Sequence, residues 1–232
     1  MPKAPKKLPK TYVMKSTDTD RVAYQVSNIL IDLGCIILRP HQPFRYNSGI
    51  ISPVYTDNRL ILSNPRDREK IVDMLIKTVR QIGIPDVIAG TSTAGIPHAA
   101  FIAQKLNLPM VYVRPKPKEY GKTNQVEGSL RKGQTVIVID DLISTGRSSI
   151  EVVNAIRKFG GKVTNIIAIT TYGLKAAEEN FAENKIKIHT LTDLDHSCEI
   201  ALEKGFLNAQ KAKIIKDWAR DPQNWAKKMG YE

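Results

Sequence analysis

The spacing of apolar residues changes along this chain, and the change predicts where helices and strands lie. In residues 18–33, apolar side chains recur every three or four positions, which places them on one face of a helix. Asn64 and Pro65 mark the start of a second helix with similar spacing. Farther along, short unbroken apolar runs are typical of strands buried on both faces. The predicted strands are residues 87–90, 110–113, 136–139, 163–170 and 185–191, and the predicted helices among them are residues 96–106 and 146–159.

Strands that alternate with helices predict an α/β fold, in which helices flank a doubly wound, mostly parallel sheet. Residues 35–60 break into short extended pieces and predict a small N-terminal hood, while residues 193–229 predict a helical C-terminus. We expect one domain over residues 16–232, preceded by a disordered basic tail at residues 1–15.

Residues 114–132 do not follow the alternation, because they have no apolar periodicity. The segment contains Pro115, Pro117, Gly121 and Gly128 among many charged residues. A connection of this length between two strands of one sheet is unusual and is often functional. The sequence therefore predicts a mobile catalytic lid at about residues 114–130.

Composition narrows the class of protein. Of the 232 residues, 42% are hydrophobic and 25% are charged, and no apolar run is long enough to span a bilayer, which favours a cytoplasmic protein without a membrane partner. Cys35 and Cys198 lack a metal-ligand spacing and are expected to be reduced. The net charge of +12 suits a polyanionic partner. Because the lysines are spread along the chain, a phosphorylated small molecule is favoured over nucleic acid.

Candidate chemistry concentrates in residues 136–149, VIVIDDLISTGRSS. Asp140 and Asp141 follow a buried strand, at the sheet edge where open α/β folds bind ligands. The glycine- and hydroxyl-rich turn after them opens a helix, whose free N–H groups form a site for phosphate. Carboxylates beside a phosphate site suit a phosphorylated sugar.

A second glycine-rich turn, Gly90 to Gly95, follows another predicted strand. It matches the first half of a nucleotide-binding P-loop, but Ile96 and Pro97 stand where that motif needs lysine and a hydroxyl residue. This argues against an NTPase. Small residues still allow backbone N–H groups to approach an anion closely. Two such turns on neighbouring strands would bracket a sugar that carries phosphate at both ends.

At this point the chain resembles a known family. Residues 136–149 are similar to the phosphoribosyl-pyrophosphate (PRPP) signature of type I phosphoribosyltransferases. Three further blocks resemble the orotate phosphoribosyltransferases among them: YNSGIISPVYTDNR at residues 46–59, AGTSTAGIPHA at 89–99 and YVRPKPKEYG at 112–121. The resemblance extends over about residues 18–220. It implies a pentosyltransferase of pyrimidine (UMP) biosynthesis, in which orotate displaces pyrophosphate from PRPP, with Mg²⁺ present, to give orotidine 5′-monophosphate.

The resemblance also implies site residues. Asp140 and Asp141 would bind the ribose hydroxyls and stabilise positive charge in the transition state, and Lys118 of the lid would be catalytic. A homodimer is implied, with the lid shared between subunits. The metal would be held mainly by substrate. The implied PRPP-binding residues are Arg114, Lys118, Tyr120, Asp140, Asp141, Leu142, Ile143, Ser144, Thr145, Gly146, Arg147, Ser148, Thr91, Ser92, Thr93, Ala94 and Gly95, and the implied orotate-binding residues are Ser144, Arg59 and Tyr172.

The chain departs from the family pattern at several positions. Pro115 stands where many members have a lid lysine, and Lys116 is the candidate to replace it. Tyr120 stands in place of a lid histidine, and Ala94 in place of a lysine in the pyrophosphate turn. An arginine that some members use for orotate is replaced near Tyr172. Arg59 is therefore the candidate for the orotate carboxylate, because of its charge and its place in the hood.

Two alternatives remain open at this stage. A purine phosphoribosyltransferase would keep the fold and the PRPP site and change the base. A nucleic-acid-binding regulator on the same fold would explain the net charge of +12. Arg114 and Lys118 argue against the regulator, since it would not need them.

Overall fold

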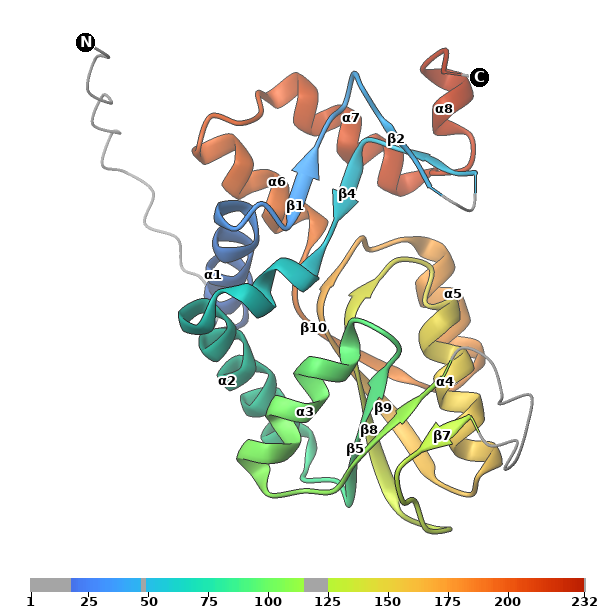
Figure 1. The fold of residues 1–232 in the computed structure, drawn as a ribbon. Helices are drawn as coiled ribbons and strands as arrows, with labels where there is room; N and C mark the ends of the chain where they lie inside the picture. The colour runs from blue at the N-terminus through green and yellow to red at the C-terminus, as the bar shows by residue number, and fades with distance from the viewer. Residues whose placement is uncertain (1–17, 47–48, 115–124, 232) are drawn as a thin grey trace.

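The computed structural model describes residues 18–46, 49–114 and 125–231 (Figure 1). Its centre is a six-stranded sheet with the order β10-β9-β8-β5-β6-β7. The strands are β5 (Val87–Thr91), β6 (Met110–Val113), β7 (Val126–Glu127), β8 (Thr135–Ile143), β9 (Lys162–Thr171) and β10 (Lys187–Asp193). All neighbouring pairs are parallel except β6 and β7, which confirms the predicted mostly parallel sheet.

Two details differ from the sequence prediction. β8 does not end at Ile139, because its pairing with β9 continues through Ile143 opposite Thr171. The acidic pair is therefore part of the strand. The last part of the predicted lid also belongs to the folded core, since Val126 lies in β7 and Leu130 is buried. The short strand β7 lacks the apolar run that would have predicted it.

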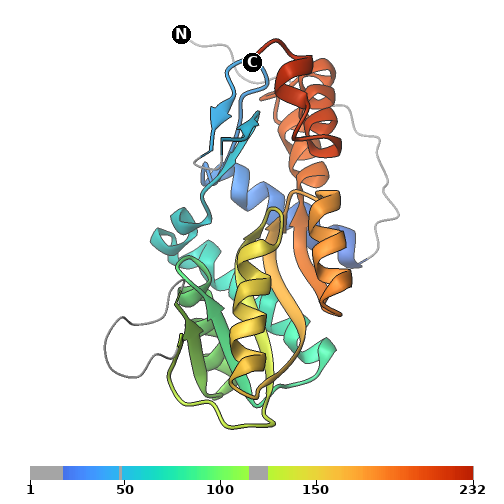
Figure 2. The same ribbon diagram turned by 90° about the vertical axis from the view of Figure 1, so that its right-hand side faces the viewer.

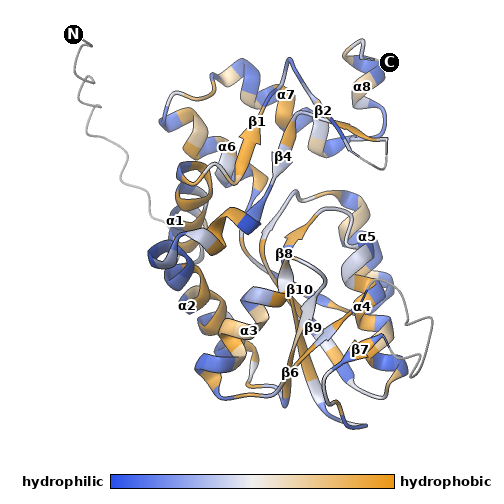
Figure 3. Cartoon of the chain, viewed as in Figure 1, coloured by the Kyte–Doolittle hydropathy of each residue, from blue (hydrophilic) through white to orange (hydrophobic). Residues whose placement is uncertain are grey.

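Helices cover both faces of the sheet, as predicted. The helices α1 (Asp18–Asp32), α2 (Pro65–Ile82) and α3 (Gly95–Leu106) lie on one face, and α4 (Arg147–Lys158) and α5 (Lys175–Glu183) lie on the other (Figure 1). Successive residues of β8 point to opposite cores: Ile137 and Ile139 pack with the first group, and Val136 and Val138 with the second. Both faces of this part of β8 are apolar for this reason, and Figure 3 shows hydrophobic residues in the strands of the sheet.

The hood stands above the carboxyl edge of the sheet, next to the C-terminal helices (Figures 1 and 2). It consists of two short antiparallel pairs, β1 (Ile36–Leu38) with β4 (Val54–Thr56) and β2 (Phe44–Arg45) with β3 (Ile51–Ser52), followed by the 3₁₀ helix η1 (Asn58–Ser63). The C-terminal helices are α6 (Leu194–Glu203), α7 (Ala209–Arg220) and α8 (Trp225–Lys228). Trp218 joins the two parts: its buried indole N–H donates to the Ile51 carbonyl oxygen at 3.1 Å.

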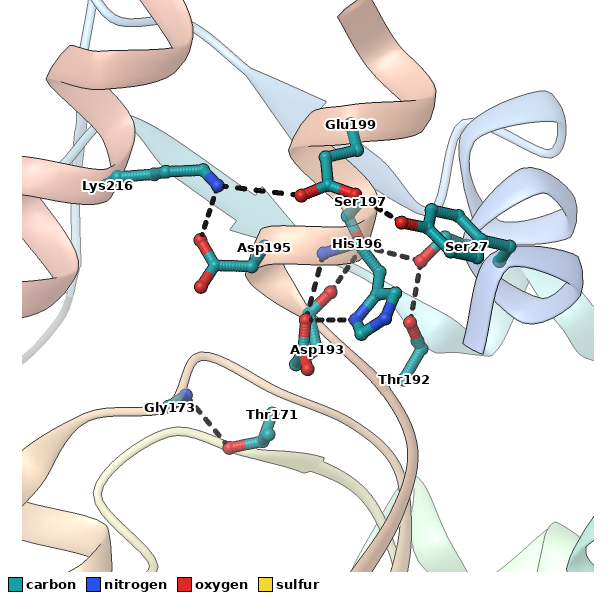
Figure 4. A network of polar contacts seen from close by, with 11 residues as sticks. Ser27, Thr171, Gly173, Thr192, Asp193, Asp195, His196, Ser197, Glu199 and Lys216 are labelled. Carbon is teal, nitrogen blue, oxygen red and sulfur yellow. Dashed lines mark hydrogen bonds and ion pairs between the residues drawn. The ribbon is translucent and has the colours of Figure 1, made fainter. Parts of the chain in front are cut away.

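Buried hydroxyl groups join α1, β10 and α6 (Figure 4). The Ser27 hydroxyl lies 2.6 Å from the Thr192 hydroxyl and 3.2 Å from that of Ser197. The Ser197 hydroxyl in turn donates to the Asp193 carbonyl oxygen at 2.8 Å. These bonds satisfy polar groups at the start of α6 that would otherwise be buried without partners.

Both cysteines are free and buried. Burial raises the pKa of each thiol to about 12, so neither is a reactive thiolate at neutral pH. Within the described ranges, we find no helix with both the length and the apolarity that a membrane crossing requires.

Candidate functional site

Two turns meet at the carboxyl ends of adjacent strands. β5 pairs with β8 from Val87 opposite Val136 to Gly90 opposite Ile139, and residues of both turns, Ser92 and Ser148, line one small cavity. Each turn leads directly into a helix, α3 in the first case and α4 in the second. The two glycine-rich turns therefore lie at the same edge of the sheet, where open α/β folds bind ligands.

Asp140 lies beneath the two turns and is almost fully enclosed. The residue is only 5% exposed. One carboxylate oxygen accepts hydrogen bonds from the Thr91 hydroxyl at 2.6 Å and from the Asp141 backbone N–H at 2.9 Å. The other accepts from the Ser149 hydroxyl at 2.6 Å. Asp140 thus has protein donors on both oxygens.

Asp141 has different surroundings from those of Asp140. It is half-buried, and its backbone carbonyl oxygen accepts a hydrogen bond from the Asn58 amide of η1 at 2.8 Å. Burial raises the pKa of the Asp141 carboxyl well above its usual range, and the negative charge of Asp140 raises it further. The site thus contains a carboxylate whose charge is costly when the site is empty and would be favourable beside a cation.

The turn between β8 and α4 is shaped to present backbone N–H groups. Gly146 caps α4 in a left-handed conformation (φ 74°), and no side chain caps this helix end. An added Cβ at Gly146 would lie 2.5 Å from the Phe181 ring, so the position requires glycine for space as well as conformation. The Asn180 amide donates to the Thr145 carbonyl oxygen at 2.8 Å and fixes the turn from α5.

The turn between β5 and α3 is held equally closely. The Ser92 hydroxyl donates to the Val113 carbonyl oxygen at 2.6 Å, which ties the turn to β6. Ala94 caps α3 without a side-chain hydrogen bond. An added Cβ at Gly95 would lie 2.5 Å from the Ile139 carbonyl oxygen, so α3 approaches β8 as closely as only glycine permits.

Most residues implied by the PRPP signature surround these two turns. On the first side, β8 ends with Leu142 and Ile143, and its turn consists of Ser144, Thr145 and Gly146. The first turn of α4 then exposes Arg147 and Ser148. On the second side, the connection from β5 to α3 consists of Thr91, Ser92, Thr93, Ala94 and Gly95. Arg114 lies nearby, with its guanidinium 3.7 Å from the Glu127 carboxylate. Arg114 lines a cavity of about 50 Å³ together with Thr91, Ser92 and Ser148. Lys116, Lys118 and Tyr120 lie outside the described residues.

The predicted orotate-binding residues are in different settings. Ser144 is half-buried at the start of the β8 turn. The Arg59 side chain is 62% exposed and makes two hydrogen bonds to the Asp57 carboxylate, at 2.6 and 2.7 Å. Tyr172 is buried, with its hydroxyl 3.3 Å from that of Tyr46, and burial raises its pKa well above the usual value. Tyr172 thus joins hood to sheet, and its phenol is uncharged at neutral pH.

Several residues that build the site had no predicted role. Asn58 lies in the quoted hood block, yet its bond to β8 follows only from the fold. Asn180 and Phe181 likewise act through contacts with residues far from them in the chain. Ser149 ends the quoted stretch of residues 136–149, but its bond to Asp140 is known only from the structure. Within the described residues, no three His, Cys, Asp or Glu side chains group as metal ligands.

His98 is buried near this site, in the first turns of α3. It is 1% exposed, and neither ring nitrogen has a hydrogen-bond partner within the described residues. Burial lowers the pKa of the imidazole to about 4, with a smaller contribution from the positive charge of Arg68. The ring is therefore neutral at pH 7, as suits a structural residue.

We expect His98→Leu to reduce the acid sensitivity of the fold. Because the folded-state pKa lies below the unfolded value, the unfolded chain binds the proton more tightly, and stability falls as pH drops from about 6.5 towards 4. His98 lowers the free energy of unfolding of the wild type by up to about 3 kcal/mol at low pH. Urea unfolding at pH 7.5 and 4.5 measures it. His41→Leu, at an exposed position, is the control; equal pH dependence in both variants contradicts the prediction.

Comparisons with known proteins agree with this geometry. The family "Phosphoribosyl transferase domain" matches residues 60–198. An orotate phosphoribosyltransferase of Listeria monocytogenes is 46% identical over 204 residues, covering 88% of this chain and 98% of the relative. That of Bacillus subtilis is also 46% identical, over 206 residues, covering 88% and 95%. Among solved structures, the orotate phosphoribosyltransferase of Aeropyrum pernix superposes with a TM-score of 0.68 at 28% identity, covering 79% of this chain and 99% of that one.

Proposed function

The chain belongs to the orotate phosphoribosyltransferase family, and from this membership we infer that it transfers ribose 5-phosphate from PRPP to orotate. The products are orotidine 5′-monophosphate and pyrophosphate, in the pyrimidine pathway to UMP. The observation that best supports this inference is the pair of uncapped helix starts at adjacent strand ends, with Asp141 close by. One turn suits each phosphorylated end of the donor.

The two turns would fix the donor by its ends. We propose that residues 144–148 bind the 5′-phosphate and that residues 91–95 bind the pyrophosphate, to which Arg114 adds positive charge. A donor held at both ends has its reactive carbon in a defined position, which removes much of the entropic cost of reaction. Ser144, half-buried at the start of its turn, would contact both substrates.

Asp141 would then act on the sugar. As pyrophosphate departs, positive charge develops on the ribose ring, and a fixed carboxylate stabilises that charge without reorganisation. The raised pKa of Asp141 reflects an environment that penalises its negative charge before the cation forms. Such a group contributes more in the transition state than in the ground state.

We also propose Mg²⁺ as the cofactor. This ion prefers oxygen ligands and usually binds through one or two carboxylates together with substrate phosphates. The ion would be held mainly by the substrate, and Asp141 offers a half-buried carboxylate beside it. The bound ion would neutralise charge on the pyrophosphate leaving group.

The residues that bind orotate and the action of the lid remain predictions. We propose that orotate lies under the hood, with its carboxylate toward Arg59, which must then share its guanidinium with Asp57. Tyr172 would support this pocket through its ring, since its hydroxyl faces Tyr46. Lys118 would be supplied by the lid, shared across a homodimer, and would exclude water on closure.

The test is a base-specific assay of pyrophosphate release from PRPP, with and without Mg²⁺. We expect turnover with orotate and Mg²⁺ and none with adenine or hypoxanthine. Turnover with a purine and not with orotate would reverse the assignment of the base. Salt-sensitive binding to nucleic acid without any pyrophosphate release would instead favour a regulator.

A further inference from the structure

We propose that Thr91 and Ser149 are positioning residues that act through Asp140, and that this buried carboxylate fastens the two phosphate-binding turns to each other. The inference rests on the proposed function and deepens it. It assigns different tasks to the acidic pair: Asp140 holds the site together, and Asp141 faces the substrate.

The hydrogen bonds to Asp140 come from three separate parts of the site. Thr91 is the last residue of β5 and begins the pyrophosphate turn. Ser149 lies in the first turn of α4, directly after the 5′-phosphate turn. The third donor is the backbone N–H of Asp141. A single carboxylate thus connects one turn, the other turn and the strand between them.

The chemistry of the groups makes this connection specific. An ionised carboxylate only accepts hydrogen bonds, and each hydroxyl has one proton to give. The two hydroxyl bonds to Asp140 are 2.6 Å long and lie where solvent has almost no access, since Thr91, Asp140 and Ser149 are all buried. Charge-assisted bonds in such a place are short and strong. Protein donors thus occupy three of the roughly four acceptor sites of this carboxylate.

The packing around Thr91 leaves it little freedom. An added Cβ at Gly95 would lie 2.4 Å from the Thr91 hydroxyl oxygen and 3.3 Å from the Asp140 Cα. The hydroxyl also lies 3.3 Å from the Ile139 carbonyl oxygen. The Thr91 hydroxyl is therefore packed closely between the start of α3 and β8. This packing fixes the turn between β5 and α3 relative to Asp140 and Asp141.

The distance between the two turns should matter for catalysis. A donor bound at both ends reacts fast only when its anomeric carbon lies at the correct place beside Asp141, and small displacements are costly. If Thr91 or Ser149 loses its hydroxyl, each turn keeps its own backbone groups, but the two are no longer fastened together. Turnover should then fall more than the affinity for either phosphate.

The experiment compares Thr91→Val, which removes only the hydrogen bond, with Thr91→Ser, which keeps the hydroxyl. In assays with orotate and Mg²⁺, we expect Thr91→Val to have a kcat/KM roughly 10- to 100-fold below that of wild type, mostly through kcat. Thr91→Ser should keep most of the wild-type value. A loss confined to thermal stability overturns the inference.

A double-mutant cycle identifies the group through which Thr91 and Ser149 act. If both act through Asp140, then Thr91→Val and Ser149→Ala should each have little further effect on kcat in an Asp140→Asn background. Additive losses would overturn the inference while leaving the proposed function intact. The proposed function fails separately, if wild-type protein does not convert orotate at all.

Discussion

Asp141→Asn is expected to lower kcat on the order of 100- to 1000-fold, the usual cost of removing one preorganised electrostatic group from a transition state. Asparagine has nearly the same shape and keeps the backbone carbonyl that binds Asn58. Only the negative charge is lost, and that charge is needed most when the ribose becomes cationic. Steady-state kinetics with orotate and PRPP measure the change, and KM for PRPP should move much less than kcat.

The same substitution should make the folded protein more stable at alkaline pH. Burial and Asp140 raise the folded-state pKa of Asp141 above its unfolded value, so the folded chain holds that proton more tightly. The stability that protonated Asp141 contributes is therefore lost as pH rises through its folded-state pKa. Asparagine has no proton to lose in this pH range, so the variant escapes this loss. Denaturant unfolding at pH 8.5 should show the variant to be at least as stable as wild type.

Asp73→Asn, on an exposed part of α2, is the matched control and should leave kcat unchanged. A kcat for Asp141→Asn within threefold of wild type would contradict the role given to this carboxylate. So would a fall in kcat that accompanies a loss of folding stability at pH 8.5, since the fall would then report damage to the fold.

The sheet and its helices followed from the sequence because burial imposes a periodic pattern. β8 must be apolar on both faces, and Ile137 and Val138 show this without any knowledge of the partners they pack against. β7 was missed because a two-residue strand is defined by its pairing with β6, and pairing leaves no local pattern. The last residues of the predicted lid, from Val126 to Leu130, are part of the folded core through such tertiary contacts, which the local sequence does not show.

The site was predictable where chemistry depends on local sequence. The turns at Gly95 and Gly146 were predicted from glycine and hydroxyl residues that stand close together in the chain. The different settings of Asp140 and Asp141 were not predictable, since both are aspartates in the same signature. That difference comes from Thr91, 49 residues away in the chain from the carboxylate it donates to. Tertiary contacts therefore decide which of the two carboxylates is buried and which is half-buried.

Gly95→Ala is the second change for which we expect a large effect, because two neighbours occupy the place of the new methyl group. The Cβ would lie 2.4 Å from the Thr91 hydroxyl oxygen and 2.5 Å from the Ile139 carbonyl oxygen. Rotation of Thr91 relieves only the first contact, and the second is with backbone, so α3 must move away from β8. Overpacking of this kind costs about 1–3 kcal/mol of folding free energy.

The displacement should reach function through the pyrophosphate turn, which Gly95 ends. We expect KM for PRPP to rise and kcat to fall, each roughly tenfold or more, because small displacements of a substrate-positioning group are costly. Gly83→Ala is the control: its φ of 120° strains alanine, yet no atom lies within 4 Å of the new Cβ, and the position is at the far end of α2. That variant should lose stability and keep its kinetic constants. If Gly95→Ala lost stability alone, as the control does, the close approach of α3 to β8 would serve the fold and not the substrate.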